Sequence, residues 1–232
     1  MPIGHKKWGK MISIQNVSKD YTLGKTIVKA LRGVNLEIDN GEFVCISGPS
    51  GCGKSTLLNL IGCLDKPTTG IVTIDGQDVG KLNKNQLAEI RSRKIGFIFQ
   101  SFNLIPVLDV YENIELVFMS WKDFLKEEMD RRIISLIEEV GLKEYIKHKP
   151  GELSGGQMQR VSIARALVTN PQVVLADEPT ANLDSKTSKK ILEIMVDLNE
   201  RHNTTFIFST HDPIVSGYAK RNIDLFDGEI KK

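Results

Sequence analysis

The segment Gly48–Ser55 reads Gly-Pro-Ser-Gly-Cys-Gly-Lys-Ser and matches the pattern G-x-x-x-x-G-K-S/T. The apolar run Phe43–Ser47 precedes it, and Lys54–Gly62 follows with leucines and an isoleucine at helical spacing. In such a strand–loop–helix, glycines let backbone N–H groups point at phosphate, and the helix N-terminus adds positive potential. The sequence therefore predicts a nucleotide-phosphate site formed by Gly48, Pro49, Ser50, Gly51, Cys52, Gly53, Lys54, Ser55 and Thr56.

Three side chains of this loop have separate expected roles. Lys54 is expected to reach the β- and γ-phosphates, and the Ser55 hydroxyl is expected to bind Mg²⁺. Thr56 is expected to add a phosphate contact. The alternative is a flexible loop that matches by chance, and the strand and helix on either side disfavour it.

A pair of carboxylates follows a second apolar strand. Val173–Ala176 is apolar at every position, as in a buried parallel strand, and it leads into Asp177 and Glu178. Parallel sheets bind ligands at the carboxyl ends of their strands. Asp177 is therefore expected to hold Mg²⁺, through water, and Glu178 to polarise a water towards the γ-phosphate as general base. An exposed strand end without function is the alternative.

A second helix start also carries the features of an anion site. Ser154 is a good N-cap residue, and Gly155 and Gly156 leave backbone N–H groups uncovered. Gln157 completes the run Leu153–Gln157, and the residues after it have apolar side chains at helical spacing. The alternative is a helix that is merely capped, which would require only the serine.

Together, the phosphate loop, Asp177–Glu178 and Leu153–Gln157 resemble the ATPase subunit of ABC transporters, over nearly the whole chain from Met11. Four further positions match that family in order. They are Tyr21, where the family stacks an aromatic ring on adenine; Gln100, like the glutamine that touches Mg²⁺ and senses the membrane partner; Asp184, in the loop that crosses to a second subunit; and His211, like the histidine that contacts the γ-phosphate.

The resemblance implies a mechanism and partners. Two copies would pair head to tail, so that the Ser154–Gln157 segment of one covers the ATP held by the phosphate loop of the other. It implies ATP and Mg²⁺ as ligands, an integral membrane permease as a further partner, and a position at the cytoplasmic face of the membrane. The implied catalytic residues are Lys54, Gln100, Glu178 and His211, and the implied metal ligands are Ser55, Gln100 and Asp177.

Within that family, 61–70 and 102–106 resemble the branch of lipoprotein-release and macrolide-export ATPases. Two features depart from the pattern of this branch: position 181 is alanine where the branch often has glycine, and residues 117–126 do not match its usual segment. An apolar run at 102–108 after Gln100 is either core or a docking groove for a partner helix. The chief rival function is an ABC ATPase that relays a signal without transport. A soluble P-loop kinase and a DNA-repair or translation ABC protein fit the motifs less well.

The remaining patterns define the expected fold. Alternation over Met11–Phe43 predicts antiparallel strands, and the later strands alternate with helices. We expect an α/β protein: a P-loop NTPase core with a mainly parallel sheet, an N-terminal antiparallel β subdomain, and an inserted helical subdomain at about 105–155. Residues 1–10 are expected to be a flexible arm and 11–232 the ATPase domain.

The composition limits the partners. There are 31 Lys and Arg and 29 Asp and Glu, for a net charge of +2, so the chain has no bulk attraction for nucleic acid. Three cysteines without metal-ligand spacing predict reduced thiols. No run is apolar enough to span a membrane, so another chain is expected to supply the spans.

Overall fold

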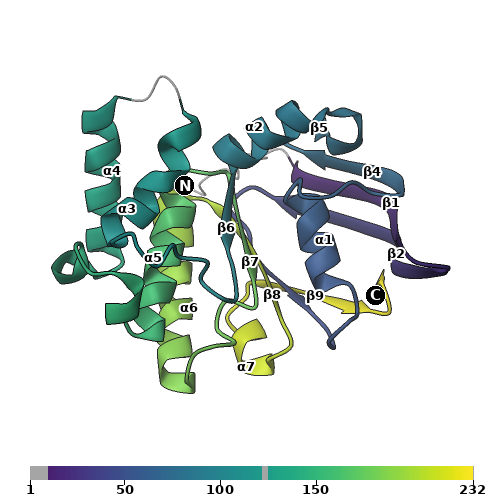
Figure 1. Cartoon of the computed structure of the whole chain (residues 1–232). Helices are drawn as coiled ribbons and strands as arrows, with labels where there is room; N and C mark the ends of the chain where they lie inside the picture. The colour runs from purple at the N-terminus through teal and green to yellow at the C-terminus, as the bar shows by residue number, and fades with distance from the viewer. Residues whose placement is uncertain (1–9, 122–124, 232) are drawn as a thin grey trace, which may run out of the picture.

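The computed structural model describes residues 10–121 and 125–231, shown in Figure 1. The predicted arm, apart from Lys10, lies outside the described residues. Lys10 itself opens the first strand of the fold.

An antiparallel sheet forms the N-terminal part, as the alternating sequence predicts. Its strands lie in the order β2-β1-β4-β5. Ile12 and Ile14 are buried, whereas Gln15 and Asn16 are exposed. The bounds are β1 (Lys10–Leu23), β2 (Thr26–Asp39), β4 (Thr69–Ile74) and β5 (Gln77–Asp78).

A second sheet has the order β10-β9-β3-β8-β7-β6 and is parallel except for the β9–β10 hairpin. The predicted turn at Asp227-Gly228 joins that hairpin, and both residues have positive φ, as this tight turn requires. The bounds are β3 (Phe43–Ser47), β6 (Ile95–Ile98), β7 (Val173–Asp177), β8 (Thr205–Thr210), β9 (Arg221–Phe226) and β10 (Glu229–Ile230).

Helices cover both faces of this parallel sheet. The α-helices are α1 (Lys54–Ile61), α2 (Lys84–Lys94), α3 (Val110–Glu115), α4 (Lys126–Glu139), α5 (Gly155–Leu167), α6 (Ser185–His202) and α7 (Pro213–Ser216). Single 3₁₀ turns lie at Val79–Lys81, Leu116–Ser120, Lys143–Tyr145 and Pro150–Glu152.

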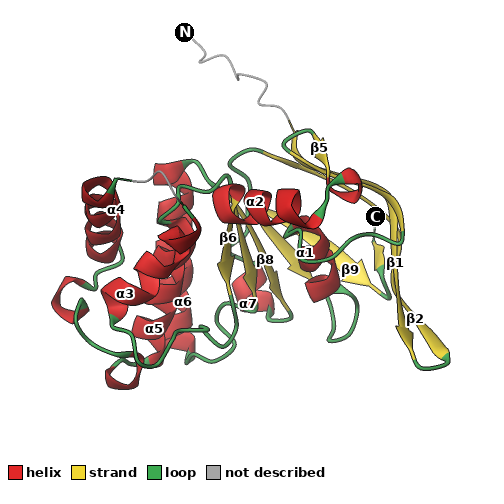
Figure 2. Ribbon diagram, turned by 45° about the horizontal axis from the view of Figure 1, so that its top comes forward, coloured by secondary structure: helices red, strands yellow, loops and turns green. Residues whose placement is uncertain are grey.

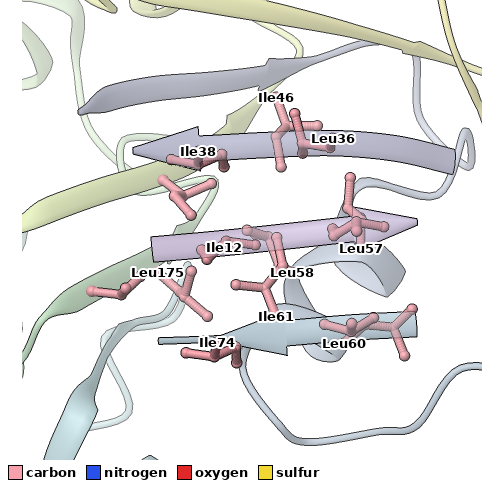
Figure 3. Packing of buried hydrophobic residues seen from close by; sticks show 14 of the residues in the cluster. Ile12, Leu36, Ile38, Ile46, Leu57, Leu58, Leu60, Ile61, Ile74 and Leu175 are labelled. Carbon is pink, nitrogen blue, oxygen red and sulfur yellow. The ribbon is translucent and has the colours of Figure 1, made fainter. Parts of the chain in front are cut away.

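Strand β3 separates two apolar cores. Val44 and Ile46 belong to a cluster with α1 and the antiparallel sheet, part of which Figure 3 shows. Phe43 and Cys45 face the opposite side, where they join a cluster with α3, α4, α5 and α6. Successive residues of a strand point to opposite faces, so an uninterrupted apolar strand is buried on both. In Figure 2, α1 lies between the two sheets, and the larger helices gather at the other end.

The inserted region matches its expected helical character. Between 105 and 155 the described residues form helices and 3₁₀ turns but no strand. The helix predicted over 123–140 is α4, and positions 123–124 lie outside the described residues. Within the part of the chain that the structure describes, no helix is both long and apolar enough to cross a bilayer.

Candidate functional site

The carboxyl ends of four parallel strands meet at one edge of the sheet. Ser47 ends β3 opposite Thr210 of β8, and Asp177 ends β7 opposite Ser209. Ile98, the last residue of β6, pairs with the residue before Asp177. The predicted residues follow these strands directly: the phosphate loop after β3, Gln100 after β6, Glu178 after β7 and His211 after β8.

The phosphate loop requires glycine at its two ends for steric reasons. A Cβ at Gly48 would lie 2.1 Å from the Leu225 carbonyl oxygen, and one at Gly53 would lie 2.5 Å from the Ala30 carbonyl oxygen. Both glycines have positive φ, at 152° and 108°. The pattern of glycines is therefore imposed by strands β2 and β9, which press on the loop from outside.

Lys54 lies inside the loop that it is predicted to serve. Its side chain is buried, and its Nζ donates hydrogen bonds to the carbonyls of Gly48 at 2.7 Å and Pro49 at 3.0 Å. Helix α1 begins at Lys54 without any side-chain cap, because the N-cap residue is Gly53. The loop therefore combines an ammonium group with helix N–H groups for which the described residues supply no side-chain cap.

The predicted metal ligands offer only oxygen atoms. The hydroxyl of Ser55 is exposed on α1, and the carboxylate of Asp177 accepts a hydrogen bond from Ser209 Oγ at 2.5 Å. Gln100 adds an amide oxygen two residues after β6. Oxygen donors suit Mg²⁺, which keeps several waters and uses few protein ligands. These residues therefore fit a magnesium ion that is also bound by phosphate and water.

Glu178, the predicted base, has a strained backbone and a carboxylate held by two neighbours. Its backbone has a left-handed φ of 48°, a conformation that costs about 1 kcal/mol or more for residues other than glycine. Its carboxylate contacts His211 Nδ1 at 2.7 Å and accepts a hydrogen bond from the Thr210 hydroxyl at 3.2 Å. The Glu178 side chain is 17% exposed, whereas that of His211 is 65% exposed. The end of β8 therefore holds the Glu178 carboxylate through Thr210 and His211.

Gln100 is exposed and is tied to the segment that follows Glu178. The backbone carbonyl of Gln100 accepts a hydrogen bond from the Asn182 amide at 2.9 Å. The loop then turns through two consecutive left-handed residues, Phe102 and Asn103. The guanidinium of Arg165 on α5 donates to the carbonyls of both, at 2.7 and 2.6 Å.

The second predicted anion site lies elsewhere in the chain. Ser154 Oγ accepts from the Gln157 amide, and the Gln157 side chain accepts from the Ser154 amide, so α5 begins with a complete capping box. Ser154 is exposed. Helices α1 and α5 belong to different cores and lie on opposite sides of the central strands in Figure 1. One chain therefore does not bring Ser154–Gln157 to its own phosphate loop.

Asp184 has a structural task that the sequence motifs did not indicate. Its carboxylate caps α6 by accepting hydrogen bonds from the amides of Lys186 and Thr187 and from the Thr187 hydroxyl. These bonds, with Thr187 first, lower the pKa of Asp184. A Cβ at Gly156 would lie 2.5 Å from Thr187 Cγ2, so the start of α6 packs against the start of α5.

Tyr21 lies beside the phosphate loop, in β1. Its hydroxyl donates to Asp65 Oδ2 at 2.9 Å. Burial raises its pKa, and Asp65 raises it further, whereas the nearby Thr56 hydroxyl lowers it. Thr56 is the third residue of α1, so the ring lies near the helix start that is expected to hold phosphate.

The apolar run at 102–108 is divided between core and surface. Leu104 packs against the helical core, whereas Ile105 and Val107 are 43% and 71% exposed. A cavity of about 580 Å³ lies beside Asn103 instead, lined by Phe99, Val117 and residues of α2 and α5. Of the run 102–108, Asn103 lines this cavity, and most of its surface comes from other elements.

Several residues of the site had a sequence signal too weak to be recognised. Ser209 and Thr210 end an apolar strand, as Asp177 does, and such a polar end could have indicated a role. Asn182, Asp65 and Arg165 gave no local signal, because their partners lie 82, 44 and 62 residues away.

Comparison with known proteins shows the family to which the chain belongs. The sequence model of the ABC transporter family matches residues 31–181. The ABC transporter ATP-binding protein MJ0796 of Methanocaldococcus jannaschii is 50% identical over 225 residues, which cover 96% of each chain. The macrolide export ATP-binding/permease protein MacB of Syntrophobacter fumaroxidans is 45% identical over 222 residues, covering 95% of this chain but 31% of that protein.

A solved structure extends the likeness to three dimensions. The dimeric, post-hydrolysis state of MJ0796, bound to ADP and Pi, has a TM-score of 0.86 and 48% identity, and it covers 96% of this chain and 97% of that chain. The predicted P-loop NTPase fold is thus confirmed. This chain belongs to the ABC transporter family and is an ATP-binding cassette of that family.

Proposed function

We propose that this chain hydrolyses ATP with Glu178 as general base and drives a membrane transport complex. The observation that carries the proposal is the Glu178 carboxylate, which lies at the sheet edge shared with the phosphate loop and is hydrogen-bonded to His211 and Thr210. A carboxylate fixed in this way accepts the proton of a water as its oxygen attacks the γ-phosphorus. The bond from that phosphorus to the β–γ bridging oxygen breaks, and ADP and phosphate are the products.

The other residues of the edge bind and orient the nucleotide. The loop amides and the Lys54 ammonium hold the phosphates, and the aromatic ring of Tyr21 receives the base. Ser55, Asp177 and Gln100 supply the oxygen donors for Mg²⁺, which would neutralise charge on the phosphate oxygens. His211 would keep the Glu178 carboxylate in place and contact the γ-phosphate.

A second copy completes the site. Ser154, at the start of α5, is exposed and separated from the phosphate loop of its own chain, and the MJ0796 relative is dimeric with ADP and Pi bound. We infer a head-to-tail pair in which each ATP lies between one phosphate loop and the partner's Ser154. ATP then stabilises the closed pair, and hydrolysis opens it.

A permease is the proposed membrane partner. The macrolide exporter relative carries a permease name, and we propose that this chain works with a permease at the cytoplasmic face of the membrane. We propose that the cavity beside Asn103 receives a short partner helix, because it adjoins the loop after Gln100, the residue expected to sense the membrane partner. Val117→Asp inside the cavity should then weaken permease-stimulated hydrolysis, and Met119→Asp outside it should not.

The Glu178→Gln variant tests the chemistry. Glutamine keeps the size of the side chain but cannot accept the proton, so hydrolysis should fall by roughly 100-fold to 10,000-fold. Affinity for ADP, measured by calorimetry on the same preparation, should stay unchanged. A variant that still hydrolyses ATP at more than a tenth of the original rate would show that another group is the base.

A further inference from the structure

A cluster of three side chains joins the antiparallel sheet to the segment after α1. Asp65 follows α1, and Lys19 and Tyr21 lie two residues apart on β1. The two carboxylate oxygens of Asp65 bind different partners. Oδ2 accepts a hydrogen bond from the Tyr21 hydroxyl at 2.9 Å, and Oδ1 accepts one from Lys19 Nζ at 2.7 Å. None of the roles described above uses Asp65 or Lys19.

Asp65 is itself held firmly. Its Oδ1 also accepts a hydrogen bond from the Lys66 amide at 2.7 Å, and Lys19 Nζ donates to the Lys66 carbonyl at 2.8 Å. The Lys19 side chain is only 11% exposed. Burial raises the pKa of Asp65, but the hydrogen bonds from Lys19, the Lys66 amide and Tyr21 outweigh it and hold the pKa below its usual range. The carboxylate is therefore a fixed, charged acceptor.

This cluster sets the position of the Tyr21 ring. The Asp65 bond fixes the outer end of the ring, and Lys19 Nζ lies over one face, 4.9 Å from the centroid. A base could then stack only on the opposite face. Tyr21 retains partial exposure, and its hydroxyl lies next to Thr56 of α1.

We propose that Asp65 is a positioning residue for nucleotide binding: through the Tyr21 hydroxyl, it holds the ring in the orientation in which the base of ATP or ADP stacks. The proposal rests on the function proposed above. An aromatic ring held before the ligand arrives loses less freedom on binding than a ring that must first be ordered. Asp65 therefore acts on the base alone and not on the phosphates.

The rival interpretation is that Asp65 only stabilises the connection between α1 and β4. Loss of Asp65 would then disturb the phosphate loop and the base site together. Pyrophosphate, which carries no base, separates the two interpretations. ADP and Mg-pyrophosphate share the phosphate loop, and only ADP reaches Tyr21.

The experiment measures the affinity of the full chain for ADP and for Mg-pyrophosphate by calorimetry. The variants are Tyr21→Phe, Asp65→Ala, the double variant and Tyr21→Ala. Asp78→Ala is the matched control, because this acidic residue also accepts a hydrogen bond from a backbone amide and pairs with a lysine, but at the end of β5. Tyr21→Phe tests the role of Asp65 even if Asp65→Ala folds poorly, because it removes the hydrogen bond to Asp65 by deleting only the Tyr21 hydroxyl.

We expect Tyr21→Phe and Asp65→Ala each to weaken ADP binding by about threefold to tenfold, with no further loss in the double variant. Tyr21→Ala should weaken ADP binding by about tenfold or more, since base–aromatic stacking is lost. Pyrophosphate affinity should be the same in all of them. Additive losses in the double variant, or a loss of pyrophosphate affinity equal to that of ADP in Asp65→Ala, would overturn the role of Asp65.

Two outcomes separate this inference from the proposed function. Unchanged ADP affinity in Tyr21→Ala would overturn the role of the ring, and that of Asp65 with it, while the phosphate site stands. Failure of the unmodified chain to bind either ligand would instead overturn the proposed function itself.

Discussion

Helices α1 and α5 both have glycine at their starts and backbone N–H groups in the first turn. The two starts differ in whether a side chain caps any of these groups. Gly53 gives α1 no side-chain cap, and Lys54 donates only to carbonyls of the loop itself. Helix α5 begins with a reciprocal capping box between Ser154 and Gln157. Neither first turn carries an acidic residue. The α1 start thus has no side-chain cap for its N–H groups, whereas at the α5 start Ser154 caps the Gln157 amide but not those of Gly155 and Gly156.

Removing the ammonium group should have the largest effect. Lys54→Met leaves the loop but takes away its charge, so ADP affinity should fall by roughly 100-fold and hydrolysis should be lost. The melting temperature should not fall, because a buried charge is replaced by an apolar chain of similar length. Lys143→Met, at a lysine that is 72% exposed on the helical side, is the control and should change neither. Equal ADP affinity in the two variants would mean that the Lys54 ammonium does not make the α1 start an anion site.

High pH should weaken the fold through one buried thiol in each of the two cores. Burial raises the pKa of the Cys45 thiol to about 12 and that of Cys63, past the end of α1, to about 11. Unfolded thiols release their protons above about pH 9 and the folded ones do not. The contribution of the two protonated thiols to the free energy of unfolding is therefore complete below about pH 9. It is lost as the pH rises towards the folded pKa values of about 11 and 12, by roughly 1 kcal/mol per thiol at pH 10.

Urea unfolding at pH 8 and pH 10 measures this loss. The Cys45→Ala/Cys63→Ala variant should show less of it than the unmodified chain. An identical pH dependence in both proteins would mean that the thiols are not responsible.

The smallest effect should come from the cap of α5. Ser154→Ala removes one half of the capping box, so the free energy of unfolding should fall by about 1 kcal/mol. Ser185→Ala, in the first turn of α6, is the control, because Asp184 supplies that cap. Unfolding in urea compares the two variants. An equal loss of unfolding free energy in both variants, or no loss in either, would mean that the α5 start is not stabilised by its own side chains.

The sequence was informative where a local pattern carries the physics. The apolar run Val173–Ala176 ending in carboxylates predicted a buried strand and its polar edge. The alternation after Met11 likewise predicted a sheet with one exposed face. Such patterns depend on residues a few positions apart, so they can be recognised without the fold.

Features that depend on distant partners could not be predicted. The left-handed backbone of Glu178 depends on its hydrogen bonds to Ser209 of the next strand. The Asp65 bond to Tyr21 joins residues 44 positions apart. Asp184 was interpreted as a residue at the interface between copies, and its cap on α6 appears only once the helix is placed. Its contact with a second copy stays a prediction.

Sedimentation velocity on Glu178→Gln, with and without Mg-ATP, tests most directly whether each ATP lies between two copies. If each ATP lies between two copies, the protein should be a monomer without nucleotide and a dimer with Mg-ATP. Adding Ser154→Arg, which places a bulky side chain at the exposed α5 start, should restore the monomer while ADP affinity stays unchanged. A Glu178→Gln/Ser154→Arg protein that still dimerises with Mg-ATP would contradict the composite site.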